Sequence, residues 1–309
     1  MPSGYQATQI YHQLPSTKLS YSVSVEHLDS ESLLPQPITL VPKRGMPHCP
    51  GHPMVGGVPP SLLKGPNMAD NNKTRILSFS SPWLSTVLVA SAPNVAIDNA
   101  IVMNLSTRPA NYEAGLYRGS IAPFHSKSLR ECMVIGAEQV LICETQQREN
   151  LGGLLREWTW YGEKDSNFDR RTPLYVSPQE EIGEVEFNPG EVFGLAHSGT
   201  KGLQRFHLKL NLWYAPAFTD CGIHCEHTFL EVHTQLIGTG RMQKFRENSS
   251  NTLFEDLIVP AGSTHPPFFN LKSDGTFDYP WHRYFSDSDC VWMAIEFHPT
   301  QGERYEVQS

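Results

Sequence analysis

The chain has 309 residues, of which 39% are hydrophobic and 18% charged, and its formal net charge is −8 with a pI of about 5.9. This length is enough for one large or two small packed domains. The acidic balance and the lack of a basic or basic-aromatic run argue against nucleic-acid binding. No apolar stretch approaches the roughly 20 residues of a membrane span. The N-terminus has no charged segment followed by an apolar one, so we expect no secretory signal, a cytoplasmic location and reduced cysteines.

Composition divides the chain into regions. Residues 1–75 are rich in Pro, Gly, Ser and His without periodicity, which predicts an irregular or flexible N-terminal arm. From residue 76 onward, short apolar runs alternate with turn residues. The clearest runs cover residues 85–90, 132–135, 139–143 and 183–187. Short strands at this spacing, without long helical periods, predict an all-β sandwich or barrel.

The segment 225–233 carries an unusual set of polar residues. Alternate side chains of a strand lie on one face. A strand here would therefore place five side chains together, namely Cys225, His227, Phe229, Glu231 and His233. Buried polar groups need a partner or a metal ion, so the pattern indicates a divalent metal site rather than plain core.

The residues after this segment predict a hairpin and a second strand. Gly238 and Gly240 flank a threonine and give a turn signal. Residues 257–259 then form an apolar run that stops at Pro260, and His265 follows the turn.

The two segments resemble the two motifs of the cupin superfamily, whose members are double-stranded β-helix, or jelly-roll, barrels. The first motif reads H-x-H, three or four residues, E, six residues, G. His227, Glu231 and Gly238 match its second His, its Glu and its Gly. Cys225 stands where the first His belongs, and His224 comes one residue earlier.

The second cupin motif reads G, five residues, P-x-G-x-x-H, three residues, N. Pro260, Gly262 and His265 match its central part. Phe254 replaces the leading Gly, and Asn270 lies one residue too far along the chain. Both motifs occur in the right order, so the resemblance predicts a cupin barrel.

The resemblance implies a metal site made of His227, Glu231 and His265. Cys225 is the candidate fourth ligand, with His224 or His233 as alternatives. Two histidines and one carboxylate suit Fe(II), while Mn, Ni or Zn are alternatives. The competing interpretation is a metal-free barrel whose polar interior serves another purpose.

The resemblance also bears on domain organisation. Weak matches to the two motifs occur between residues 76 and 200. They predict a degenerate cupin-like β-domain at residues 76–200, followed by the metal-bearing barrel at residues 201–309. The chain would then resemble a bicupin, with two tandem barrels. The alternative is a single barrel with extended N-terminal strands around it. A homodimer is a further expectation from the resemblance.

Three residues are candidates for catalysis. His282 and His233 could transfer protons, because the ordinary pKa of a histidine lies near neutrality. Arg241, just after the glycine turn, could orient a substrate carboxylate or phenolate. The competing interpretations are a hydrogen-bonded loop histidine and a solvated arginine. In the final strand, residues 290–298, we expect the apolar face to be core and Glu296 and His298 to face outward.

These features predict a metal-dependent enzyme for a small aromatic or polyketide-like metabolite, and first of all a non-heme iron dioxygenase. The alternative is a redox-neutral isomerase, dehydratase or cyclase of secondary metabolism, in which His227, His233 or His282 moves protons. A third hypothesis is a non-catalytic barrel that binds a small molecule.

Overall fold

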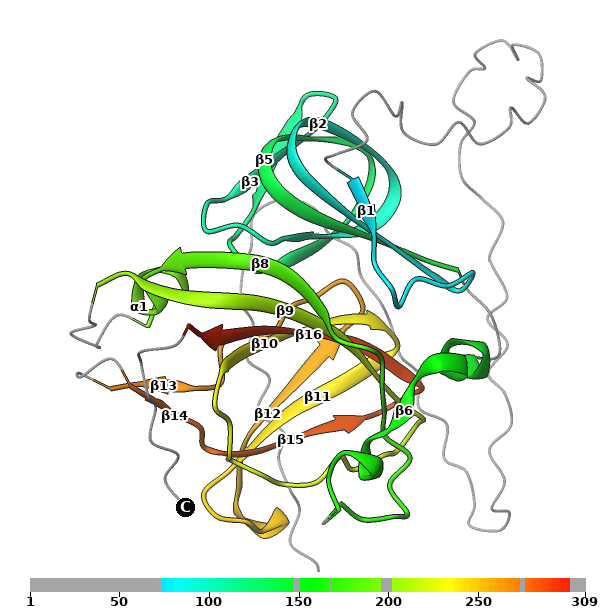
Figure 1. The fold of residues 1–309 in the computed structure, drawn as a ribbon, viewed down its shortest axis with the longest axis vertical. Coiled ribbons are helices and arrows are strands. Elements are labelled where there is room, and N and C mark those ends of the chain that lie inside the picture. The colour runs from blue at the N-terminus through cyan, green and yellow to red at the C-terminus, as the bar shows by residue number, and fades with distance from the viewer. Residues whose placement is uncertain (1–73, 147–150, 167, 196–201, 273–275, 301–309) are drawn as a thin grey trace, which may run out of the picture. The chain divides into compact units, whose positions relative to one another are not determined.

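The computed structural model of the chain describes residues 74–146, 151–166, 168–195, 202–272 and 276–300 (Figure 1). Almost all of the expected N-terminal arm, residues 1–75, lies outside this part. Within it, strands dominate and no helix is longer than seven residues, so the all-β class is confirmed. No helix in these ranges is long and apolar enough to cross a membrane.

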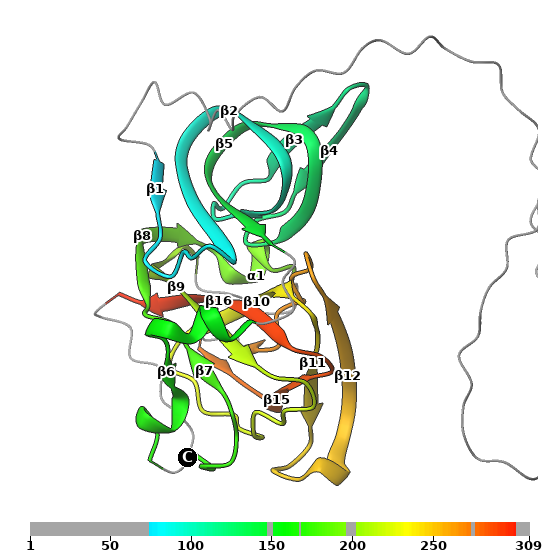
Figure 2. The same ribbon diagram turned by 90° about the vertical axis from the view of Figure 1, so that its right-hand side faces the viewer.

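The first sheet is built mainly from two long strands that roll up together. Its strand order is β1-β2-β5-β3-β4, and all pairings are antiparallel. Ile101 of β2 lies opposite both Ser128 and Cys143 of β5, so the two strands curl back on themselves (Figure 2). The strands of this sheet are β1 (Thr74–Ile76), β2 (Leu84–Asn104), β3 (Ala110–Ala114), β4 (Tyr117–Ile121) and β5 (Ser126–Thr145).

The second region contains two larger sheets and a short ribbon. One sheet has the order β10-β16-β9-β7-β6, with β8 also paired to β9, and the other has the order β12-β11-β15. β13 and β14 pair with each other. The bounds are β6 (Thr159–Trp160), β7 (Tyr175–Val176), β8 (Glu180–Phe187), β9 (Gln204–Ala215), β10 (Leu230–Ile237), β11 (Thr239–Phe245), β12 (Leu253–Pro260), β13 (Asn270–Leu271), β14 (Phe277–Asp278), β15 (Trp281–Ser286) and β16 (Cys290–Pro299).

Short helical turns connect these strands. They are the 3-10 turns η1 (Leu151–Glu157), η2 (Tyr161–Glu163) and η3 (Ser250–Thr252), and the helix α1 (Pro189–Val192). α1 begins after Asn188, whose side chain accepts a hydrogen bond from the Gly190 N–H at 3.0 Å. This is the usual way in which an asparagine caps a helix N-terminus. β6, β7 and β8 precede residue 200 but belong to the same sheet as β9.

β16 has a core on both of its faces. On one face, Val291, Met293, Ile295 and Phe297 are fully buried in the largest apolar cluster, where Phe297 packs edge-on against Phe124. On the other face, Glu296 is only 4% exposed and accepts hydrogen bonds from Asn211 at 2.9 Å and Gln179 at 2.8 Å. The expectation that Glu296 faces outward is therefore wrong, because the sheet is covered on both sides.

The expected strands largely agree with the structure, with one correction. The runs at residues 85–90, 132–135, 139–143 and 183–187 all lie in β2, β5 or β8. Gly238 makes the turn between β10 and β11 with φ +78°, which a residue with a side chain rarely adopts. The strand expected from residue 225 begins only at Leu230, so the alternation argument does not apply to Cys225 and His227.

Candidate metal centre

The chain between β9 and β10 approaches β15 through a pair of backbone hydrogen bonds. The His224 N–H donates to the His282 carbonyl at 2.9 Å, and the His282 N–H donates to the His224 carbonyl at 2.8 Å. This reciprocal pair is an isolated antiparallel bridge, and it brings the two imidazole rings to a centroid distance of 4.4 Å. The backbone therefore fixes two histidines that are far apart in sequence.

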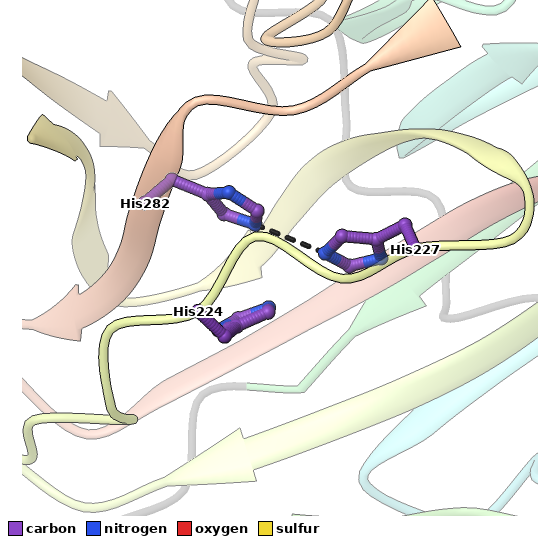
Figure 3. A group of neighbouring side chains, drawn as sticks. All are labelled: His224, His227 and His282. Atoms are coloured by element: carbon purple, nitrogen blue, oxygen red, sulfur yellow. Dashed lines mark hydrogen bonds between the residues drawn. The ribbon is translucent and has the colours of Figure 1, made fainter. Parts of the chain in front are cut away.

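His227 completes a group of three histidines (Figure 3). One ligand atom from each of His224, His227 and His282 lies within 4.8 Å of the other two. The shortest contact joins His227 Nε2 to His282 Nε2 at 3.1 Å. His282 is buried, His227 is mostly buried and His224 is exposed, so the group has one side toward solvent.

The Nδ1 atom of each ring faces an oxygen that can only accept a hydrogen bond. His282 Nδ1 is 2.8 Å from the Pro280 carbonyl, and His224 Nδ1 is 3.2 Å from the Gly222 carbonyl. His227 Nδ1 lies 3.3 Å from a carboxylate oxygen of Glu231. A proton on each Nδ1 satisfies these contacts and leaves each Nε2 with a lone pair. Metal-binding histidines typically have this arrangement, with the second nitrogen held by a carbonyl or carboxylate.

The contact between the two Nε2 atoms needs a proton or a metal ion between them. Two lone pairs 3.1 Å apart repel unless a proton or a cation lies between them. Burial lowers the pKa of His227 to about 4, despite the opposing charge of Glu231, and burial also holds the pKa of His282 well below its usual range. An added proton is therefore disfavoured at neutral pH. Two nitrogens that are each about 2.1 Å from one metal ion lie roughly 3.0 to 3.4 Å apart, so the pair fits a metal ion.

Glu231 lies behind His227 as a buried carboxylate. Its oxygens are 3.3 Å from His227 Nδ1 and 3.2 Å from His233 Nε2. Burial alone would raise the pKa of Glu231, but the neighbouring imidazoles of His233 and His227 outweigh it and hold this pKa below its usual range. An ionised Glu231 between two rings orients His227 rather than joining the three-histidine group.

The structure places the other sequence-predicted ligands outside this group. Both ring nitrogens of His265 are engaged, since Nε2 accepts the His233 N–H at 3.1 Å and Nδ1 donates to the Pro266 carbonyl at 2.8 Å. Cys225 is half-buried against the apolar core, and burial raises the pKa of its thiol. Metal ligation by His265 or Cys225 stays a prediction from the motifs.

The predicted catalytic residues lie in three different settings. His282 belongs to the histidine group itself. His233 lies next to it, bonded through Nε2 to Glu231, while its Nδ1 has no partner among the described residues. The Arg241 guanidinium is occupied by ion pairs with Asp287 and Asp256, each at 2.8 Å. Arg241 therefore has an evident structural use, and a substrate-binding role for it stays a prediction.

Sequence reasoning assigned His282 to acid–base chemistry and treated His224 only as an alternative fourth ligand. Two sequence features pointed toward the histidine group. These are the close spacing of His224 and His227, and the position of His282 two residues after Pro280. That signal does not reveal the contact between His227 and His282, because 55 residues separate them.

Aromatic rings enclose the buried side of the group. The Tyr279 ring lies 4.3 Å from the His227 ring, and the Phe268 ring lies 4.7 Å from the His282 ring, measured between centroids. The Tyr279 hydroxyl accepts the Glu231 N–H and donates to the Phe229 carbonyl, both at 3.0 Å. These contacts anchor the start of β10 and so fix the position of Glu231.

No family model matches the chain, and no curated protein is significantly similar to it in sequence. Many solved structures match it, among them the following three. A DUF861-family protein of unknown function from Pseudomonas syringae pv. tomato has a TM-score of 0.27 and 9% identity over 70% of this chain and 83% of its own. The coconut allergen cocosin has a TM-score of 0.25 and 6% identity over 70% and 77%. Oxalate decarboxylase from Bacillus subtilis, which has Mn(II) centres, has a TM-score of 0.25 and 9% identity over 71% and 70%.

The three structures share at most 9% identity with this chain, with TM-scores of at most 0.27. Their likeness to this chain is remote, and it assigns no activity, substrate or metal to it.

Proposed function

We propose that this protein is a metal-dependent enzyme that acts on a small organic substrate, with one divalent transition metal ion held by His224, His227 and His282. The observation that carries the proposal is the 3.1 Å contact between the Nε2 atoms of His227 and His282. Their Nδ1 atoms already face a carboxylate and a carbonyl, so both lone pairs point at one place. A metal ion satisfies both lone pairs at once.

Three neutral imidazoles leave coordination positions open for a substrate. Imidazole ligands suit iron, zinc, nickel and copper, and manganese accepts them beside oxygen ligands. We place Fe(II) first and a dioxygenase reaction first, in line with the sequence analysis. When bound, iron(II) would supply oxygen chemistry at positions next to a coordinated substrate oxygen.

The residues of the chain give the site its shape and its orientation. Glu231 holds the His227 ring in place, and the bridge between His224 and His282 fixes the other two rings. Tyr279 and Phe268 exclude water from the buried side, while the exposed His224 marks the side from which a substrate would enter. Aromatic walls of this kind support an aromatic or polyketide-like substrate.

A second candidate is a redox-neutral isomerase, dehydratase or cyclase. The observation that favours it is the pair formed by His233 and Glu231, in which Nε2 faces the carboxylate and Nδ1 has no partner among the described residues. An imidazole backed by a carboxylate can take up a substrate proton. In this reaction the metal ion would act as a Lewis acid.

The test begins with elemental analysis of protein purified without added metal or chelator. Aliquots are then loaded anaerobically with Fe(II), Mn(II) or Zn(II), and O₂ uptake is measured with a panel of phenols and aromatic acids. We expect about one equivalent of iron and O₂ uptake that depends on substrate. One equivalent of zinc or manganese without O₂ uptake would favour the redox-neutral candidate. Failure to bind any of these metals would contradict the proposal.

A further inference from the structure

His233 has a buried ring nitrogen for which the described residues provide no partner. The residue is 8% exposed, and its Nδ1 has neither solvent contact nor a hydrogen bond. Nε2 lies 3.2 Å from a carboxylate oxygen of Glu231, which can only accept, so the proton is on Nε2. Nδ1 therefore has a lone pair and is an acceptor. Buried polar groups are normally satisfied, and an exception calls for an explanation such as a ligand.

Three hydrogen-bond donors in this part of the barrel are already used. The His265 Nδ1 donates to the Pro266 carbonyl, the Tyr284 hydroxyl donates to Gln235, and the Tyr279 hydroxyl donates to the Phe229 carbonyl. The rings of His265 and Tyr284 are neighbours of the His233 ring, with centroids at 5.0 and 6.4 Å. None of the described residues donates to Nδ1, which leaves this acceptor to a bound molecule or to water.

Two separate contacts connect His233 with the three-histidine group. Glu231 touches His233 with one carboxylate oxygen and His227 with the other. The Phe268 ring lies 5.6 Å from the His233 ring and 4.7 Å from the His282 ring, measured between centroids. Glu231 and Phe268 thus each contact both His233 and a member of the three-histidine group, so His233 is one side chain removed from that group.

We propose that His233 is a substrate-binding residue whose Nδ1 accepts a hydrogen bond from a hydroxyl or N–H group of the substrate. This inference rests on the proposed function, since it assumes that another atom of the same molecule meets the metal ion. The substrate class is then a small organic molecule with a metal-binding oxygen and a separate hydrogen-bond donor. Hydroxylated or aminated aromatic compounds fit both the donor and the aromatic walls.

A second histidine–glutamate pair provides a matched control. His298 Nε2 lies 2.7 Å from Glu296, which is buried on β16. Unlike His233, the His298 side chain is 25% exposed, so water can reach it. A substitution of His298 removes the same type of ring from the same type of pair without removing a buried, unsatisfied acceptor.

The experiment uses two substitutions that separate the two nitrogens. His233→Gln keeps an amide group within reach of Glu231 and removes the acceptor at Nδ1. His233→Asn places an amide oxygen close to the Nδ1 position. The probes are phenols, hydroxy acids and aromatic amines, each paired with its O- or N-methylated form, and they are titrated calorimetrically into the metal-loaded full chain.

We expect the wild type to bind at least one hydroxyl or amino probe ten times more tightly than its methylated form. His233→Gln should abolish that preference, His233→Asn should restore part of it, and His298→Gln should leave it unchanged. The inference is overturned if no probe shows the preference, or if the preference survives in His233→Gln. Metal content is measured on the same samples. A wild type without metal would refute the proposed function, whereas a metal-loaded wild type without the preference refutes only the role of His233.

Discussion

The two β regions of this protein differ in what they bury. Among the described residues of β1 to β5 and their loops, the buried polar side chains are those of Thr86, Asn104 and Ser106. From β9 to β16 the buried polar set includes three histidines and two glutamates, which are His233, His265, His282, Glu231 and Glu296. Similar antiparallel strands therefore enclose an apolar interior in one region and an ionisable one in the other.

The polar groups of the first region satisfy each other locally. The Asn104 side chain donates to the carbonyls of Arg108 and Ile121 at 2.7 and 3.1 Å, and it accepts hydrogen bonds from Ser106. In the second region, the Nε2 atoms of His227 and His282 contact each other at 3.1 Å, and His233 Nδ1 has no partner among the described residues. The two regions have similar strands, so the strand architecture does not distinguish the candidate site. What distinguishes it is the presence of buried ring nitrogens without a local hydrogen-bond donor.

The largest effect is expected from a core substitution in the first region, which should lower stability without changing metal binding. Ile121 of β4 is fully buried in the apolar cluster of the first region. Ile121→Ala should lower the free energy of unfolding by about 2–5 kcal/mol, because it removes methylene groups and leaves a cavity. Urea unfolding measures this loss. Metal content per folded molecule should stay the same. A loss of metal would show that metal binding also depends on the core of the first region.

The next prediction concerns the two buried glutamates, which lie directly opposite each other on β10 and β16. Glu231→Gln should weaken metal binding about 10- to 100-fold, the usual effect of losing a group that orients a metal-binding histidine. Competition with a chromogenic chelator measures the affinity. Glu296→Gln is the matched control and should leave it unchanged. Complete loss of metal in Glu231→Gln would instead indicate that Glu231 binds the metal directly.

Acid should destabilise the metal-free protein through His265. Burial, and then the neighbouring His233 imidazole, lowers the pKa of His265 to about 3, whereas an unfolded histidine has an ordinary pKa of about 6.5. Between these values the unfolded chain binds the extra proton, so stability falls as the pH drops from about 6.5 toward 3. Stability is unaffected by this residue above that range.

The slope from His265 amounts to about 1.4 kcal/mol per pH unit at most. His265→Gln keeps an acceptor for the His233 N–H but cannot titrate. Urea unfolding between pH 4.5 and 7.5 should therefore show a flatter pH dependence for the variant than for the wild type. Equal slopes would mean that His265 is protonated in the folded protein.

The smallest effect is expected at Arg241. Its ion pairs with Asp256 and Asp287 lie at a partly exposed surface, where such pairs contribute little. Arg241→Gln should shift the unfolding midpoint only slightly and leave metal affinity and substrate turnover unchanged. A marked rise in KM with unchanged metal content would restore the substrate-orienting role predicted from the sequence.

The sequence was sufficient to predict the all-β class, most strands and the turn at Gly238. It also grouped His227, Glu231 and His233, and the structure does bring these three together around the Glu231 carboxylate. The strand predicted over Cys225 and His227 was nevertheless wrong, because β10 begins at Leu230. Local polarity patterns cannot show where a loop ends and a strand begins.

The sequence alone could not predict that His224, His227 and His282 lie together. The positions of His224 and His227 depend on the backbone bridge between His224 and His282, which joins distant parts of the chain. The motif resemblance pointed to His265, and hydrogen bonds occupy both of its nitrogens. Which histidine has a free lone pair depends on these long-range contacts, and no motif spacing contains that information.

The central claim is that His224, His227 and His282 hold the metal ion, and one paired measurement tests it most directly. His282→Ala and His265→Ala are purified in parallel without chelator, checked for folding by circular dichroism, and analysed for metal together with the wild type. We predict about one equivalent of metal in the wild type and in His265→Ala, and none in His282→Ala. Metal retained in His282→Ala but lost from His265→Ala would contradict the account and return the site to the ligands that the cupin motifs predict.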